Sequence, residues 1–168
     1  MSRKLMALAD RLSDWTGRSV AWLLLAMVVT TVVVVVMRYA LDQGAIMLQE
    51  SVTYMHALTF MLGIPFALKE NAHVRVDLIY TRLGPRSQAA IDLGGHLLFL
   101  IPVSVCVLIY SLPYVAGAWR ILEGSPEVGG LPAVFLLKTL IPVTAVLLII
   151  QGLAETLRSI AIMRGHDG

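Results

Sequence analysis

Two of the four histidines lie in long apolar stretches, where an imidazole can ligate a haem iron. A b-type haem in a helical bundle takes two histidines from facing helices at the same depth. His56 falls near the middle of its stretch, whereas His96 falls about one turn inside the end of the next stretch. At 1.5 Å of rise per residue, the two differ in depth by roughly 10 Å. The spacing therefore argues against a haem, and we expect no cofactor.

The rest of the sequence shows no pattern typical of an enzyme. It contains no paired carboxylates, HExxH, GxSxG or phosphate-binding loop. The single cysteine, Cys106, lies in an apolar run without a CxxC partner. The net charge of +2 is too small to indicate nucleic-acid binding. We expect a non-catalytic chain with no metal site and no nucleic-acid partner.

The composition indicates a membrane environment. Hydrophobic residues make up 58% of the 168 residues and charged residues only 14%, whereas soluble domains carry about a quarter charged residues. A helix needs about 20 mostly apolar residues to cross the hydrocarbon core. Four stretches have this length, at about residues 19–37, 47–68, 91–115 and 134–157. The sequence predicts an all-α integral membrane protein with four transmembrane helices in a single domain, 1–168.

The basic residues predict the orientation. Most lysines and arginines lie in the N-terminal segment, in the loop 69–90 and in the C-terminal tail. On the other side of the predicted membrane lie only Arg38, Arg120 and Lys138. Because positive residues concentrate on the cytoplasmic side of membrane proteins, both termini are predicted to be cytoplasmic.

Two segments outside the spans have an apolar face between charged residues. Within residues 1–18 that face holds Leu5, Leu8, Leu12 and Trp15, and within the loop 69–90 it holds Val76, Ile79, Tyr80 and Leu83. The helical spacing predicts amphipathic helices that lie at the membrane surface. A solvated linker is the alternative interpretation of each segment.

Polar and small residues form stripes on two of the predicted spans. On the second span, one narrow helical face holds Gln49, Thr53, His56, Phe60, Gly63 and Ala67. On the fourth, a similar stripe holds Thr144, Leu148, Gln151 and Glu155. A ligand or proton path would use such a face, but we favour helix packing, in which small residues allow close approach and polar ones bond a neighbour. The stripes indicate a larger partner in the membrane.

Two ionisable residues lie near the outer ends of the spans. Glu50 falls one turn inside the second span, where it can pair with Arg38 at the end of the first. Lys138 falls about one turn inside the fourth span. One interpretation has its side chain reaching out to the lipid headgroups, and the other has it positioning the outer loop or contacting a partner.

The stretch MLGIPFALKENAHVRVDLIYTRL, residues 61–83, resembles the signature of the DctQ family, the small membrane subunits of tripartite ATP-independent periplasmic (TRAP) transporters. In that family an acidic residue begins the second span, a glycine lies late in it, and a basic or polar turn precedes His-x-x-x-Asp. The matching residues here are Glu50, Gly63, Lys69 to Asn71, His73 and Asp77, and the Arg38–Tyr39 pair matches the end of the first span. The resemblance extends from about residue 15 to residue 158.

Residues 125–155 resemble a subgroup labelled mannitol/chloroaromatic or 2-oxo-acid type. In one departure from the family pattern, many members have two acidic residues where this chain has Gln49 and Glu50. A role that requires both acids is therefore not carried over to this chain.

The resemblance implies a subunit of a secondary active importer of organic acids, usually coupled to sodium, in the bacterial inner membrane. A periplasmic binding protein of the DctP type captures the substrate, and a large DctM-like subunit carries substrate and ions by an elevator-type movement. The small subunit would brace the fixed part of the large subunit and help dock the binding protein. The residues expected at these partner interfaces are Arg38, Glu50, Thr53, His56, Gly63, His73, Asp77, Arg120, Glu123, Glu127, Lys138, Gln151 and Glu155.

Two other functions compete with this one. A haem-binding membrane anchor subunit of a respiratory enzyme would show a Soret band when purified. A self-sufficient small channel or carrier would transport in liposomes without another protein. The sequence shows no internal repeat of the kind that transporter cores are often built from, which argues against the second.

Overall fold

The computed structural model describes residues 2–72, 80 and 82–165, and these residues form helices and connecting loops without a strand. The helices are α1 (Ser2–Ala40), α2 (Ile46–Lys69), α4 (Pro85–Gly95), α5 (Ile101–Arg120) and α6 (Val134–Met163). A π-helical turn, η1 (His96–Leu100), joins α4 to α5, so that residues 85–120 run as one continuous helix. Four helices are long and apolar enough to cross a membrane: α1, α2, the continuous α4–α5 helix and α6. The prediction of an all-α protein with four transmembrane helices is confirmed.

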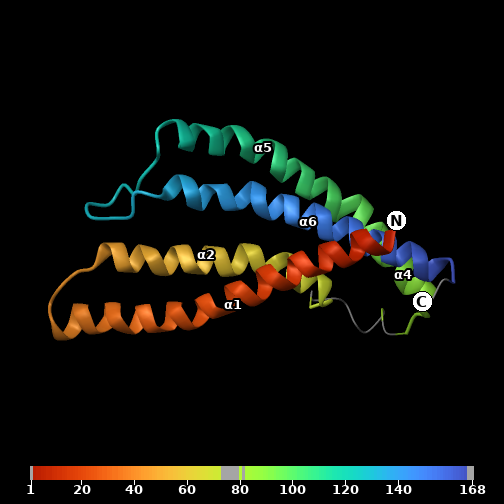
Figure 1. Ribbon diagram of the computed structural model, residues 1–168, viewed down its shortest axis with the longest axis horizontal. Helices are drawn as coiled ribbons and strands as arrows, with labels where there is room; N and C mark the ends of the chain where they lie inside the picture. Colours follow the sequence, from red (N-terminus) through yellow and green to blue (C-terminus); the bar gives the residue numbers. More distant parts are fainter. Residues whose placement is uncertain (1, 73–79, 81, 166–168) are drawn as a thin grey trace.

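The helices form two antiparallel hairpins, α1 with α2 and α5 with α6 (Figure 1). Both termini lie at the same end of the molecule, which we call the terminal end. The loops 41–45 and 121–133 lie at the opposite end, which we call the loop end. The first half of α1 crosses from α2 to α6, and α2 also packs along α6. These contacts join the two hairpins.

Helix α1 extends well beyond one membrane crossing. Its 39 residues span about 58 Å, about twice the thickness of the hydrocarbon core. In its valine-rich half, the hydroxyl of Thr30 donates to the carbonyl of Ala26 at 2.8 Å, and that of Thr31 to Met27 at 2.7 Å. Bonding back to the preceding turn removes the cost of placing a hydroxyl in hydrocarbon. The predicted amphipathic segment 1–18 is continuous with this span, in one helix.

Pro102 is the local cause of the π-helical turn. Pro102 has no backbone N–H, and its ring crowds the carbonyl oxygen four residues earlier. The turn before it is widened, and the N–H of Ile101 bonds to the carbonyl of His96, five residues back. Pro85 begins α4, where a missing N–H costs nothing.

Small side chains fill most of the interior. The buried apolar residues of the described chain are Ala9, Val20, Leu68, Ala89, Val115, Ala118, Ala145 and Ala154. A side-chain Cβ at Gly17 would lie 2.5 Å from the ring of Phe66, so glycine is what lets α1 and α2 approach here. Most large apolar side chains are instead exposed on the outside of the bundle. This distribution is typical of a protein surrounded by lipid or by membrane partners.

The second predicted amphipathic helix lies mostly outside the described residues. Val76 and Ile79 of its apolar face fall in the segment 73–79, as do the motif residues His73 and Asp77. Their predicted roles are therefore untested.

Candidate partner-binding surfaces

At the loop end, Glu50 of α2 holds the loop between α5 and α6. One carboxylate oxygen accepts a hydrogen bond from the hydroxyl of Ser125, and the other accepts one from the backbone N–H of Leu131 at 2.6 Å. The sequence suggested a pair between Glu50 and Arg38, but the carboxylate is engaged by the loop and Arg38 is exposed. Glu50 thus connects the α1–α2 hairpin to the α5–α6 hairpin.

The loop also closes on itself. The N–H of Ser125 donates to the carbonyl of Leu131 at 3.0 Å, and the N–H of Gly130 donates to the carbonyl of Glu127 at 3.0 Å. A Cβ at Gly130 would collide with the side chains of Ser125 and Glu50. Glycine at this position is therefore what allows the carboxylate to reach the loop.

Lys138 forms the second connection to this loop. Its Nζ lies 2.5 and 2.7 Å from the two carboxylate oxygens of Glu123, and 4.3 Å from the centre of the Tyr114 ring. The side chain thus joins α6 to α5 and to the start of the loop. Of the two interpretations of Lys138, the structure supports loop positioning, because its charge is already paired within the chain.

The replacement Lys138→Met tests this pairing. It keeps the apolar stem but removes the charge, and we expect the free energy of unfolding to fall modestly, because both the ion pair with Glu123 and the cation–π contact with Tyr114 are lost. Thermal unfolding in detergent measures this loss. Glu123→Gln is the matched partner variant, and the double variant should lose less than the sum of the two. Additive losses would instead indicate a lysine that only reaches the headgroups.

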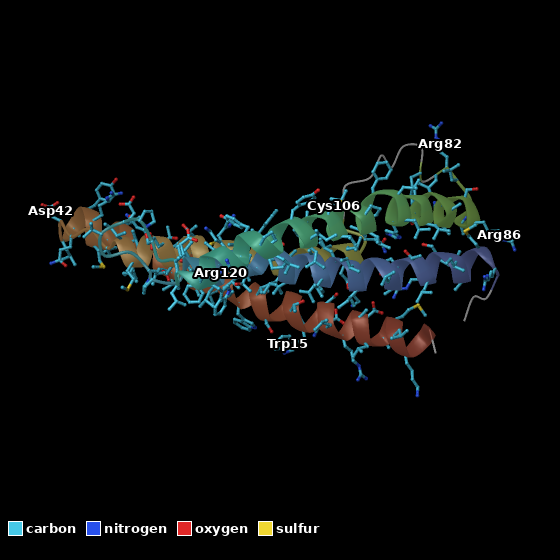
Figure 2. All side chains as sticks on the ribbon, turned by 90° about the horizontal axis from the view of Figure 1, so that it is seen from above. Trp15, Asp42, Arg82, Arg86, Cys106 and Arg120 are labelled. Carbon is cyan, nitrogen blue, oxygen red and sulfur yellow. The ribbon has the colours of Figure 1, made fainter. Side chains whose placement is uncertain are left out.

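A third contact joins α5 to α6 at the loop end. The indole N–H of Trp119 donates to the hydroxyl of Thr139 at 2.9 Å, and its ring meets that of Phe135 edge-on at 4.7 Å between centroids. The loop is therefore held at both its ends and in its middle. The loop still has exposed side chains, among them Ile121, Glu127 and Val128, and Arg120 beside it at the end of α5 is exposed as well; Val128 is 92% exposed. Arg120 lies at the end of α5 in Figure 2.

The polar stripe of α2 faces outward from the bundle. Thr53 and His56 are exposed, and neither side chain has a hydrogen bond to the described part of the chain. Phe60 is 64% exposed and stacks near His56, and nothing lies within 4 Å of a Cβ placed on Gly63. We call Thr53, His56, Phe60 and Gly63 the α2 face. No helix in the described part of the chain supplies a hydrogen bond to its polar side chains.

At the terminal end, a polar network joins α1 to α6. The amide of Gln151, which is 0% exposed, accepts from Ser13 at 2.8 Å and donates to Glu155 at 2.9 Å. The guanidinium of Arg158 reaches Asp10 at 2.9 Å and Glu155 at 2.6 Å.

This network contains two residues that the sequence predicted at a partner interface. The structure buries Gln151 and Glu155 within the chain, where they hold α1 on α6, and their contact with a partner stays a prediction. Sequence reasoning missed Asp10, Ser13 and Arg158, since no local pattern marks residues that meet across some 140 positions of chain.

A second ion pair anchors α1 to α2. The Nζ of Lys69 lies 2.5 Å from the carboxylate of Asp14 and 3.3 Å from that of Glu70. Within the described ranges, no three His, Cys, Asp or Glu side chains gather as metal ligands would. The arrangement positions helices and a loop, and offers surfaces rather than a chemical centre.

A comparison with known protein families matches residues 27–161 to the DctQ component of the tripartite ATP-independent periplasmic transporters. The match covers the last third of α1, all of α2 and of the continuous α4–α5 helix, and nearly all of α6. This chain belongs to the DctQ family. No curated protein and no solved structure matches it significantly. As a DctQ chain it is a multi-pass membrane protein and a component of a TRAP transporter.

Proposed function

We propose that this DctQ chain is the non-catalytic scaffold subunit of its transporter. It braces a large DctM-like subunit in the bacterial inner membrane, with both termini in the cytoplasm, and helps dock a DctP-like periplasmic binding protein. The complex imports an organic acid with an ion gradient, with sodium as the expected ion. The resemblance of residues 125–155 to the mannitol/chloroaromatic or 2-oxo-acid subgroup supports an organic acid as substrate.

One observation carries the proposal, namely the α2 face. His56 lies ten residues from the start of α2, about 15 Å along the helix and so near mid-membrane. An imidazole and a hydroxyl exposed to hydrocarbon without hydrogen bonds are costly. A neighbouring membrane protein that supplies polar partners removes this cost, and the open surface at Gly63 lets its helix approach closely.

Co-purification tests the proposal. The tagged chain, expressed in its native host and extracted in mild detergent, should bring a large polytopic membrane protein in equal amount. Gly63→Trp should lower that yield about tenfold or more, because the indole fills the surface that the partner needs. Gly117→Trp on α5 is the matched control, since nothing lies within 4 Å of a Cβ there either. Recovery of the chain alone, with no accompanying protein, would contradict the scaffold function.

The loop end supports the docking part of the proposal. The loop 121–133 is held by α2 and α6, and yet Val128 and Glu127 point away from the bundle. A surface that is ordered before binding loses less conformational entropy when a partner arrives. The loop therefore suits a soluble protein that must bind and leave in each transport cycle.

A further inference from the structure

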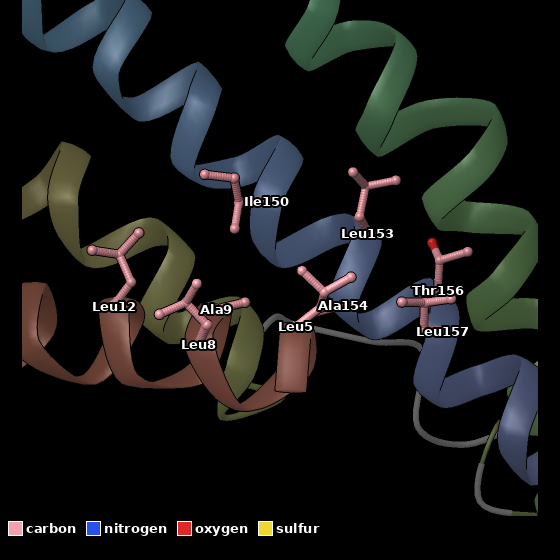
Figure 3. Close-up of a pocket in the computed structure, with 9 residues that line it drawn as sticks. All are labelled: Leu5, Leu8, Ala9, Leu12, Ile150, Leu153, Ala154, Thr156 and Leu157. Atoms are coloured by element: carbon pink, nitrogen blue, oxygen red, sulfur yellow. The ribbon is translucent and has the colours of Figure 1, made fainter. Parts of the chain in front are cut away.

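An apolar groove lies between α1 and α6 at the terminal end. It holds about 470 Å³, and Leu5, Leu8 and Leu12 of α1 line one wall, while Ile150, Leu153 and Leu157 of α6 line the other. Ala9 and Ala154 form its floor, and their small side chains are what leave the space open. Figure 3 shows the leucines of the two helices on either side of this space.

The groove opens to the outside of the bundle near one end of the membrane crossing. Leu8 is 65% exposed and Leu153 48% exposed, although both are large and apolar. The α6 wall lies within the stretch 150–157, which is the last part of the helix that the apolar sequence places in the membrane. The groove is therefore surrounded by the acyl chains and headgroups of one leaflet.

Among the described residues of α1 beside the groove, the exposed charged side chains are basic. Both acidic residues of the first 18 are engaged in ion pairs, Asp10 with Arg158 and Asp14 with Lys69. Lys4 and Arg11 are exposed and make no ion pair with the described residues. Their spacing around Leu8, four and three residues away, places them on the same side of α1 as this wall of the groove.

We propose that the groove binds an acyl chain of an anionic phospholipid, whose phosphate is held by Lys4 and Arg11. The walls extend over only about two helical turns, about 11 Å, which suits a slender acyl chain better than a packed transmembrane helix. Basic side chains at the membrane surface attract anionic headgroups. The bound lipid fills the space between α1 and α6 beside the buried polar network. This site does not depend on the transport function.

Native mass spectrometry tests the site. The full chain, with any membrane protein that accompanies it, is extracted from vesicles of equal phosphatidylglycerol and phosphatidylcholine, and the retained lipids are counted. We expect phosphatidylglycerol to be retained in preference. The double variant Lys4→Gln, Arg11→Gln should lower its retention roughly tenfold, because each basic residue near the headgroups strengthens anionic binding several-fold.

The matched control removes the same charge elsewhere at the terminal end. Arg82→Gln with Arg86→Gln alters two exposed arginines, and Figure 2 shows Arg82 on the opposite side of the molecule from Trp15 of α1. This control should retain phosphatidylglycerol as the unaltered chain does. Equal losses in both double variants, or equal retention of the two lipids, would overturn the proposal.

A second measurement locates the lipid. Phosphatidylglycerol with a photoreactive acyl chain should crosslink to residues 5–12 and 150–157 above all. Leu8→Trp, which fills the groove from an exposed wall, should lower that crosslinking several-fold, whereas Leu24→Trp at another exposed position of α1 should not. Crosslinks spread evenly over all exposed helices, or groove peptides crosslinked to another protein and not to lipid, would refute the site.

Discussion

The replacement Glu50→Ala is expected to release the loop 121–133 and to weaken docking of the periplasmic binding protein about tenfold. The carboxylate accepts two hydrogen bonds from this loop. Hydrogen bonds to a charged acceptor are stronger than those between neutral groups, and the two donors would be left without their partner. The loop would then have to be ordered at the moment of docking, which lowers affinity.

Two measurements check this result. Limited proteolysis should cut the loop in the variant and spare it in the unaltered chain. Interferometry on complexes in nanodiscs should show the weaker affinity for the proposed DctP-like binding protein. In both measurements, Glu50→Gln should fall between the unaltered chain and Glu50→Ala. Its amide oxygen can accept one of the two hydrogen bonds, but its NH₂ group would face the donor of the other.

Gln49→Ala is the matched control, since it removes a polar side chain at the adjacent position. The control should change neither the proteolysis nor the affinity. The Glu50→Ala variant should also keep its large membrane partner, in contrast to Gly63→Trp, which loses it. A Glu50→Ala chain with a protected loop and full affinity would disprove the role of the carboxylate.

The second large effect is expected from Arg158→Ala at the terminal end. The guanidinium pairs with Asp10 and Glu155, so its removal leaves two carboxylates close together without a cation. Removing one partner of a fully buried pair costs about 3–5 kcal/mol. Because the side chain of Arg158 is 38% exposed, we expect a smaller loss of about 2 kcal/mol.

The loss should appear as separation of the first half of α1 from α6. Protease sensitivity within residues 2–18 and the thermal unfolding midpoint both report it. Arg18→Ala serves as the control, because Arg18 is an exposed arginine of α1 that makes no ion pair with the described residues. It should leave the protease sensitivity and the unfolding midpoint unchanged. Asp10→Asn combined with Arg158→Ala should be less damaging than Arg158→Ala alone, because one unpaired charge is gone. An α1 that stays protected in Arg158→Ala would show that apolar contacts suffice.

Glu50 and the Arg158 network differ from the α2 face in whether their polar groups are satisfied within the chain. Glu50 and the Arg158 network are each satisfied within the chain, so they hold the two hairpins together before any partner binds. Thr53 and His56 are not satisfied within the described part of the chain. Residues that hold the chain together are thus separate from the residues of the α2 face, which we propose meet the large subunit.

The sequence by itself determined the number and place of the membrane-spanning helices. Apolar length is a local property that adds up along one segment, so 134–157 and its counterparts could be found without knowing what they pack against. The residues around Gly63 also carry the resemblance to the DctQ family, and the match over residues 27–161 bears out the family. The subgroup and the orientation remain predictions.

Only the tertiary structure decided which polar residues lie exposed on the outside of the bundle and which face inward. A helix turns by about 100° per residue, so a side chain's neighbour depends on the rotation and crossing of two helices, and no local pattern specifies either. For this reason Gln151 and Glu155 were assigned to a partner, although Asp10, Ser13 and Arg158 engage them within the chain. Glu50 was matched with Arg38 by depth alone, whereas the fold of a distant loop supplies its hydrogen bonds.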